Sequence, residues 1–251
     1  MPSKKKDSGR TRSIPTISHL SGEEIQICCL KLESDAEEMA RSWLSADEVA
    51  RAERFVSARL QENFIRSRVF LRQVLAHHLK IDPKEVSFTY GAHGKPYVRQ
   101  NDATSTLHFS FTHSGCAALL AVAWDLEIGI DLEQLRTVDQ MEDIAKRFFS
   151  QEEAGKLLAL PEESRLEAFF RCWTAKEAFV KATGEGLSRA LGSFSVSFLA
   201  DEPARINTVS DPTDTQWNLF YLQKTLPGYS AALVTKGADT VKISVNNGFD
   251  D

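Results

Sequence analysis

Two carboxylates lie two positions apart in a short apolar segment of the chain. Asp131 and Glu133 occur in the stretch 128–133, which reads Ile-Gly-Ile-Asp-Leu-Glu. On a strand, residues i and i+2 share a face, so both carboxylates would project together, with Ile130 and Leu132 on the opposite side. Like charges this close repel unless a cation lies between them, and hard oxygen ligands at this spacing suit Mg²⁺. An edge strand with a solvated polar face is the alternative that spacing leaves open.

A second candidate pair, Glu177 and Lys181, lies on a helix that we expect over 165–183. At about 100° per residue, Glu177 falls about 40° from Trp173, inside a stripe of apolar side chains, and Lys181 falls about 80° from it. A carboxylate on a buried face is costly unless it binds a cation or is paired. This favours a functional role for Glu177 over the alternative, an i,i+4 ion pair on a surface helix.

Further basic residues could meet a phosphate group. Lys95 lies in a Gly-Lys-Pro turn, and His113 ends a strand at a Ser-Gly turn. A lysine can meet a phosphate as a point charge, and a histidine can donate to one, although a solvated lysine and a structural histidine are the commoner roles. Several arginines, Arg51 among them, are expected to form a solvated helix face. The glycine-rich nucleotide-binding loops and the nucleophile elbow of serine hydrolases are absent from the sequence.

Helices and antiparallel strands occur in the same order in both halves of the chain. Capping boxes at Ser45 and Ser150 begin helices. In the first half we expect helices over 45–56 and 60–80, then strands over 86–90, 107–112, 116–124 and 128–133, the last three forming a meander. In the second half we expect helices over 150–160 and 165–183, then strands over 194–199, 217–223 and 229–235. This pattern predicts an α+β protein of two similar α/β halves, each with helices packed on a small antiparallel sheet, and a site between them.

The charge of the chain is unevenly distributed. Five basic residues and one aspartate give residues 1–16 a net charge of +4, which leaves −9 for the rest of a chain with a total of −5. We expect a disordered basic tail over 1–16, an N-terminal half over 17–129, a C-terminal half over 130–237 and a polar C-terminal tail over 238–251. The acidic body argues against nucleic acid as the main partner.

The apolar runs and cysteines bear on where the protein works. The longest apolar run, 116–124, falls far short of the roughly 20 residues that span a bilayer, so no membrane partner is expected. The four cysteines have no metal-binding spacing. Such cysteines are typical of a reducing compartment, and we expect a cytoplasmic protein.

Four motifs, in this order, resemble the phosphopantetheinyl transferases of the large, two-half type. They are GKP at 94–96, FTHSG at 111–115, GIDLE at 129–133 and WTAKEAFVK at 173–181, and two further segments, FFSQEE at 148–153 and GEGL at 184–187, also look like the family. The resemblance covers about residues 43–200. Each motif alone is weak to moderate, but four in the right order and spacing are highly specific.

The resemblance implies coenzyme A as substrate, an apo acyl or peptidyl carrier protein as partner, and an active site between the halves. Asp131, Glu133 and Glu177 look like the Mg²⁺ ligands, with Mn²⁺ as an alternative metal. Glu177 would also activate the carrier serine, directly or through water, and Lys181 would stabilise or protonate the leaving phosphate. Contacts with coenzyme A are implied for the remaining matched positions, which are Arg51, Lys95, Pro96, Thr112, His113 and Lys176.

Three positions depart from the pattern of that family. Thr112 stands where the family often has serine, a change that keeps the hydroxyl group. Asn63 stands where an arginine contacts coenzyme A, and Arg59 or Arg66 could substitute for it. Glu48 stands where a lysine can occur.

Two other functions are the alternatives to this transfer reaction. A metal-dependent hydrolase of nucleotide pyrophosphates would use these carboxylates with water in place of a serine hydroxyl. A module that binds coenzyme A or a carrier protein without catalysis would not need Asp131, Glu133, Glu177 and Lys181, which are all present. The sequence identifies neither the carrier protein nor the tolerance for acyl-coenzyme A. Because two fused halves could build one complete site, we expect a monomer.

Overall fold

A computed structural model of the chain describes residues 20, 24–32, 41–100, 104–208, 217–222, 226–237 and 241–246. The tail predicted over 1–16 lies outside the described residues. No helix in the described part of the chain is long and apolar enough to cross a membrane.

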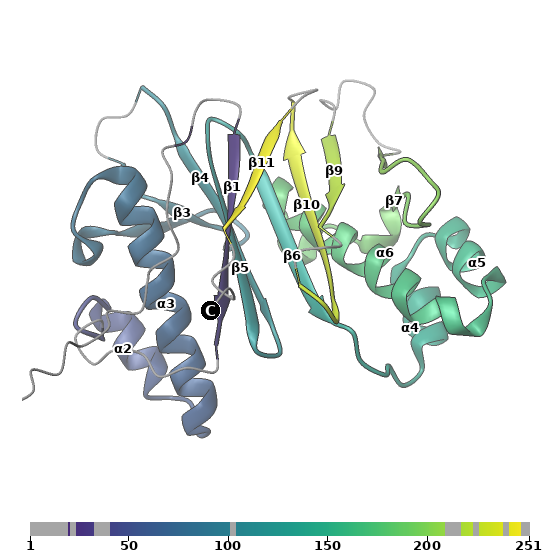
Figure 1. Cartoon of the computed structure of the whole chain (residues 1–251), viewed down its shortest axis with the longest axis horizontal. Coiled ribbons are helices and arrows are strands. Elements are labelled where there is room, and N and C mark those ends of the chain that lie inside the picture. The colour runs from purple at the N-terminus through teal and green to yellow at the C-terminus, as the bar shows by residue number, and fades with distance from the viewer. Residues whose placement is uncertain are drawn as a thin grey trace, which may run out of the picture.

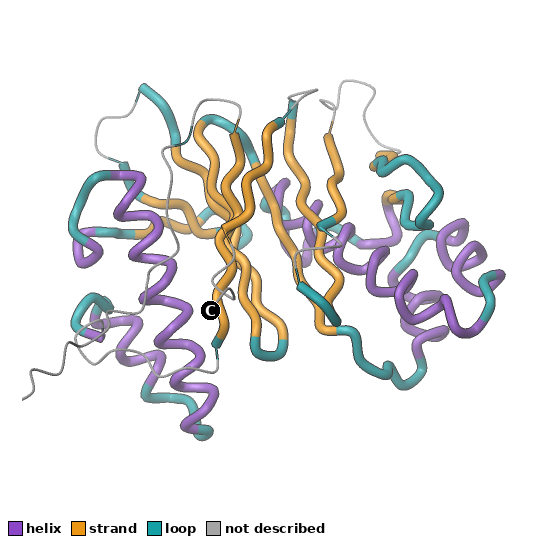
Figure 2. The backbone as a smooth tube through the Cα atoms, viewed as in Figure 1, coloured by secondary structure: helices purple, strands orange, loops and turns teal. Residues whose placement is uncertain are grey.

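Two β-sheets lie side by side at the centre of the molecule, and helices cover their outer faces (Figures 1 and 2). One sheet has the strand order β11-β1-β5-β4, with β1 at Glu24–Lys31, β4 at Leu107–Ser114, β5 at Ala117–Trp124 and β11 at Lys242–Asn246. The other has the order β6-β10-β9, with β6 at Ile128–Gln134, β9 at Trp217–Tyr221 and β10 at Tyr229–Lys236. The predicted α+β class is confirmed.

Each sheet has its own helices. The first sheet is flanked by α2 (Ala46–Ala52) and α3 (Ala58–Leu79), and the second by α4 (Met141–Phe148), α5 (Gln151–Ala159) and α6 (Glu162–Thr183). Two small hairpins complete the fold, β2 (Phe88–Tyr90) with β3 (Pro96–Val98) and β7 (Phe194–Val196) with β8 (Ile206–Thr208). Short 3₁₀ turns lie at Pro83–Glu85, Gly186–Ser188 and Leu191–Ser193.

The apolar run that forms β5 is explained by burial on both faces. Leu120 and Val122 pack against α3 in one core, whereas Leu119 and Ala121 face the second sheet in another. A strand between a helix layer and a sheet has no polar face, so its sequence reads as a continuous hydrophobic segment.

The helix ends follow the local sequence. Ser45 and Ser150 begin α2 and α5, each with a capping box, as predicted. Gly184 ends α6 in the left-handed region at φ 73°, a conformation that glycine adopts without steric cost. Helix α6 begins at Glu162, slightly before the predicted start.

The expectation that β6 completes a meander with β4 and β5 was wrong. Strand β6 pairs with β10 in the second sheet. Along β4, serine hydroxyls take the place of ladder carbonyls, because Ser110 Oγ accepts a bond from Ile130 N at 3.0 Å and Ser114 Oγ accepts one from Gln134 N at 3.1 Å. The predicted boundary at 129/130 therefore falls inside the strand that joins the two sheets.

A strand was also missed in the segment predicted as a polar C-terminal tail. Lys242–Asn246 forms β11, which pairs in parallel with β1. Its sequence alternates polar and apolar residues, and Ile243 packs on the core between the sheets. The end of the chain thus contributes to the N-terminal sheet, so the two halves are not separate along the sequence.

Candidate active site

The carboxylates of β6 and the polar residues of α6 face the same cavity. Asp131 and Glu133 project toward α6, and Glu177 and Lys181 project back, around a cavity of about 500 Å³. Strand β6 and helix α6 can approach closely because Gly129 has no Cβ. A Cβ at this position would overlap the backbone of α6, so only glycine fits there. The predicted face of β6 is confirmed, since Ile130 and Leu132 pack on the opposite side.

Asp131 has one satisfied oxygen and one orphaned oxygen. Its Oδ1 accepts bonds from Lys181 Nζ at 2.6 Å and from Thr112 Oγ1 at 3.0 Å. Its Oδ2 is buried and has no hydrogen-bond partner among the described residues. A buried carboxylate oxygen without a partner is costly, and it marks a position where a cation would be stabilised.

The pKa values of the two neighbouring carboxyl groups, those of Glu177 and Glu133, are raised. Burial, followed by the charge of Asp131, raises the pKa of Glu177, and Lys181 only partly offsets this. Burial also raises the pKa of Glu133, whose Oε2 accepts a bond from Ser114 Oγ at 2.8 Å. Three carboxylates therefore lie around the ammonium group of Lys181, with the charge of Arg136 acting on Glu133 as well, and this leaves an excess of negative charge.

These residues fit a magnesium ion. No group of three or more His, Cys, Asp or Glu side chains in the described part of the chain is arranged closely enough to hold a metal ion as it stands. Mg²⁺, however, is usually bound through one or two carboxylates, with water and phosphate oxygens completing the shell. The orphaned oxygen of Asp131, the raised pKa of Glu133 and Glu177, and the adjoining open space match that pattern.

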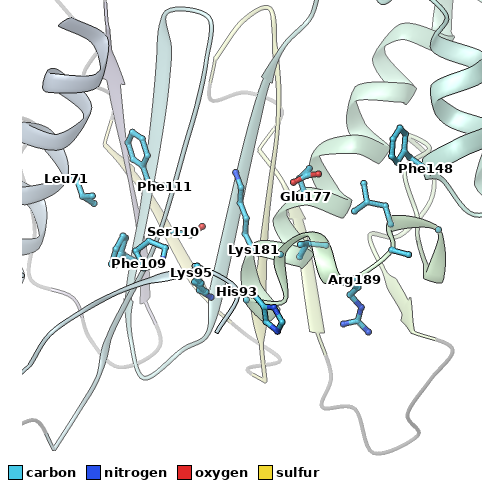
Figure 3. Close-up of a pocket in the computed structure, with 18 of the residues that line it drawn as sticks. Leu71, His93, Lys95, Phe109, Ser110, Phe111, Phe148, Glu177, Lys181 and Arg189 are labelled. Atoms are coloured by element: carbon cyan, nitrogen blue, oxygen red, sulfur yellow. The ribbon is translucent and has the colours of Figure 1, made fainter. Parts of the chain in front are cut away.

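A larger cavity of about 700 Å³ lies on the other side of Glu177 and Lys181, which line both cavities. Figure 3 shows them between Phe111 of β4 and Phe148 at the end of α4. Much of its wall is apolar, and five cationic side chains lie around it, namely Arg68, Lys95, Arg147, Lys181 and Arg189. This combination suits a long ligand that carries both neutral and phosphate groups.

A third cavity, of about 770 Å³, adjoins the other two, since Phe111 lines all three. Arg51 lines it, with its guanidinium 5.2 Å from the ring centre of Phe64. Asn63, which stands where the family has an arginine that contacts coenzyme A, lines the same cavity as Arg59. Arg59 is therefore better placed than Arg66 to substitute for that arginine.

The other predicted residues fall into two groups. Lys95 and Pro96 line the 700 Å³ cavity, and Thr112 and His113 line the carboxylate cavity. Desolvation and the charge of Lys181 both lower the pKa of His113, so its imidazole is mainly neutral near pH 7.

Lys176 is not on the wall of any of these cavities, which corrects its assignment as a contact for coenzyme A. Its side chain is 0% exposed. The ammonium group pairs with Glu153 Oε2 at 2.8 Å and donates to the carbonyl oxygens of Leu191 and Phe194 at 2.8 and 2.7 Å. It lies one position before Glu177 and therefore on a different face of α6.

Sequence reasoning missed two groups of polar residues that support the site. Ser110 and Ser114 hold β6 against β4 through their hydroxyl groups, and the alternation of polar and apolar residues along β4 is a signal that could have placed them on the face of Thr112. Glu48 is buried and paired with Arg68 and Arg72, with a distance of 2.7 Å from its Oε2 to Arg72 Nε. Glu48 thus has a structural partner and does not point to a ligand.

Comparisons with known proteins indicate the same family for both halves of the chain. A family model for the 4'-phosphopantetheinyl transferase superfamily matches residues 127–234, and one for the 4'-phosphopantetheinyl transferase N-terminal region matches residues 33–125. The chain is 41% identical over 176 residues to 4'-phosphopantetheinyl transferase HetI of Nostoc sp., covering 70% of this chain and 73% of that protein. It is 28% identical over 209 residues to 4'-phosphopantetheinyl transferase Sfp of Bacillus subtilis, covering 83% and 89%.

A solved structure of a holo-(acyl-carrier-protein) synthase from Bacillus anthracis in complex with CoA matches with 22% identity and a TM-score of 0.38. The match covers 45% of this chain and 96% of that chain.

Proposed function

The chain belongs to the 4'-phosphopantetheinyl transferase superfamily and is an enzyme of that class, and from this premise we propose how it acts. It transfers the phosphopantetheine arm of coenzyme A to a serine of an apo acyl or peptidyl carrier protein. The reaction depends on Mg²⁺ and releases adenosine 3′,5′-bisphosphate.

One observation carries this proposal. Asp131 and Glu133 of β6 and Glu177 and Lys181 of α6 line one cavity between the two halves, and an oxygen of Asp131 there is buried without a partner in the described part of the chain. Asp131, Glu133 and Glu177 would hold the metal ion. When bound, Mg²⁺ supplies Lewis-acid stabilisation of charge on the pyrophosphate.

The adjoining cavities have the size and the charges to hold coenzyme A. The pantetheine arm is neutral and long, which suits the mainly apolar cavity of about 700 Å³. Arg51 and Arg59 line the third cavity, of about 770 Å³, where their charges would attract phosphate groups, and Arg68, which is paired with Glu48, lies beside them. The pyrophosphate would lie between them, next to Lys181, which lines the carboxylate cavity and the 700 Å³ cavity.

The chain's own residues account for the proton transfers. Burial raises the pKa of Glu177, which brings its basicity closer to the working pH, as a general base requires. Glu177 accepts the proton of the carrier serine as the serine oxygen attacks the β-phosphate of coenzyme A. Lys181, paired with Asp131 at 2.6 Å, stabilises the charge on the departing bisphosphate. Phosphoryl transfer depends mainly on this positioning and charge neutralisation.

The competing function is hydrolysis of the pyrophosphate bond, with water in the place of the serine. Release of adenosine 3′,5′-bisphosphate from coenzyme A distinguishes the two, measured with an apo carrier protein, with its Ser→Ala variant and without carrier. We expect release only with the intact serine. Equal release in all three samples would establish a hydrolase instead.

A further inference from the structure

Lys95 belongs to the N-terminal half, but its ammonium group lies against the C-terminal half. Lys95 Nζ donates to the carbonyl oxygen of Ala182 at 2.8 Å and to that of Ile128 at 3.4 Å. Ala182 is in the last turn of α6, and Ile128 is the first residue of β6. One ammonium group therefore contacts both elements that carry the candidate metal ligands, at a point away from the carboxylates themselves.

The carbonyl group of Ala182 has a reason to need this donor. The last four carbonyl groups of a helix have no partner within the helix, and Ala182 is buried, with only 2% of its surface exposed. A lysine that donates to such carbonyls also interacts favourably with the negative end of the helix dipole. The lysine itself is desolvated in this position, since burial lowers its pKa to about 8.

The stem of Lys95 is held by a close contact between two loops. A Cβ at Gly184 would lie 3.0 Å from Lys95 Cδ, and a Cβ at Gly186 would lie 3.3 Å from the carbonyl oxygen of His93. Ser188 Oγ lies 3.1 Å from His93 Nδ1. Figure 3 shows Lys95 and His93 near Lys181, and all three residues line the 700 Å³ cavity. The turn between β2 and β3 thus packs against the loop that follows α6.

We propose that Lys95 is a positioning residue for the transfer reaction. Its ammonium group fixes the end of α6 against the start of β6, and this sets the spacing between Lys181 and Asp131. Lys181 lies one residue before Ala182, and Asp131 lies three residues after Ile128, so a shift of either element at Lys95 reaches the ion pair directly. The proposal rests on the proposed function for its catalytic consequence, but its structural part is independent of any activity.

Hydrogen–deuterium exchange of the ligand-free protein tests the structural part. Lys95→Met keeps the apolar stem but removes the donor. We expect the amides of 180–188 to exchange roughly tenfold faster, because a hydrogen bond from a charged donor holds this helix end closed. Amides of 70–76, in the centre of α3, should not change. Lys84→Met is the matched control, because Lys84 is an exposed lysine of the same half, and it should leave both regions unchanged.

Kinetics test the catalytic part. The ammonium group of Lys95 already donates to Ala182 and Ile128, so the proposal replaces the coenzyme A contact that the resemblance implied for this residue. With an apo carrier and Mg²⁺, Lys95→Met should therefore lower kcat by roughly tenfold or more while the Kd of coenzyme A changes by less than about threefold. Unchanged exchange at 180–188, together with a Kd raised about tenfold, would overturn the proposal and make Lys95 a direct phosphate contact.

Two further results are decisive. Should Lys95→Met not fold, Lys95→Gln is measured in the same way, with the same expected exchange and the same contrary result. Should the protein modify no carrier at all, the proposed function fails, and faster exchange at 180–188 still supports the contact between the halves, whereas unchanged exchange refutes it.

Discussion

Glu177 is the residue at which a catalytic and a structural interpretation of the site differ most. It lines both the carboxylate cavity and the 700 Å³ cavity. Glu177→Gln keeps the shape but removes a metal ligand and a proton acceptor, so single-turnover modification of a carrier should fall by about 10²–10⁴-fold. A surface ion pair with Lys181 would contribute only about 0.3–0.5 kcal/mol. Near-wild-type turnover in this variant would remove Glu177 from the mechanism.

The same substitution should stabilise the protein when no metal is present. Burial and Asp131 raise the pKa of Glu177 above the unfolded value of about 4.3. The folded state then binds the proton more tightly, so stability is fully present below the unfolded pKa and is lost as pH rises through the folded pKa. In EDTA, Glu177→Gln should therefore melt above wild type at pH 8, with a smaller difference at pH 5. An equal difference at both pH values would contradict this account.

The carboxylate set also predicts metal selectivity. EDTA should abolish turnover, and Mg²⁺ or Mn²⁺ should restore it, because Asp131 and Glu133 project from one face of β6 into the cavity and Mg²⁺ is bound through few carboxylates. Ca²⁺ should restore it poorly, since it prefers more ligands at longer distances. Turnover is measured after chelation and titration of each ion. Full activity in a chelated sample would show that the carboxylates do not serve a metal.

At the scale of elements, local signals were read correctly and long-range pairing was not. Ser45 and Ser150 begin helices through capping bonds to residues three positions away, and Gly184 ends one through a backbone bond to Val180. The two-residue period of β6 gave the common face of Asp131 and Glu133. The sequence did not show that β6 pairs with β10. It also did not show that β6 lies beside β4 through side-chain hydroxyl groups and not through a backbone ladder. Periodicity reports which face is buried but not which strand lies next to it.

The sequence predicted the main residues of the site but not the surroundings of every one of them. Glu177, Asp131, Glu133 and Lys181 do share one cavity. The position of Lys176 was not foreseen, because its partner Glu153 lies in another helix and no local pattern links the two residues. A fully buried ion pair depends on tertiary contacts alone.

The buried pair of Lys176 and Glu153 gives a prediction at this scale. Lys176→Met should lower the free energy of unfolding by about 3–5 kcal/mol, because Glu153 is then left buried without its counterion. Chemical denaturation measures this, and the double variant Lys176→Met/Glu153→Gln should recover part of the loss. Lys156→Met is the control, since Lys156 is an exposed partner of Glu152 and should cost less than about 1 kcal/mol. A similar small loss for Lys176→Met would show that the pair contributes little.

At the scale of the whole molecule, both halves line the cavities of the site, although the four residues Asp131, Glu133, Glu177 and Lys181 all come from the C-terminal half. Residues from the two sheets and from helices on both sides line the cavities, so one chain carries a complete site and we propose that it works as a monomer. Strand β11 returns from the C-terminal end to pair with β1, which ties the two halves together beyond their central contact.

The two ends of the chain should therefore respond differently to truncation. Removal of 238–251 deletes β11 and exposes the edge of β1, and we expect the melting temperature to fall by roughly 5–10 °C. Removal of 1–16 should change neither melting nor turnover, because this segment has almost no apolar residues to dock it. Thermal melting and carrier modification are measured for both. Equal effects would mean that β11 has no special role, and a raised KM for the carrier after removal of 1–16 would place that segment in the binding surface.

The most direct measurement is the intact mass of an apo carrier protein after incubation with this enzyme, coenzyme A and Mg²⁺. The account predicts a gain of about 340 Da, the mass of one phosphopantetheine arm transferred in the phosphoryl-transfer step, located at a single serine. Glu177→Gln and samples with EDTA should show no gain in the same time. Release of bisphosphate from coenzyme A by the wild-type enzyme, with the mass of the carrier unchanged, would contradict the central claim.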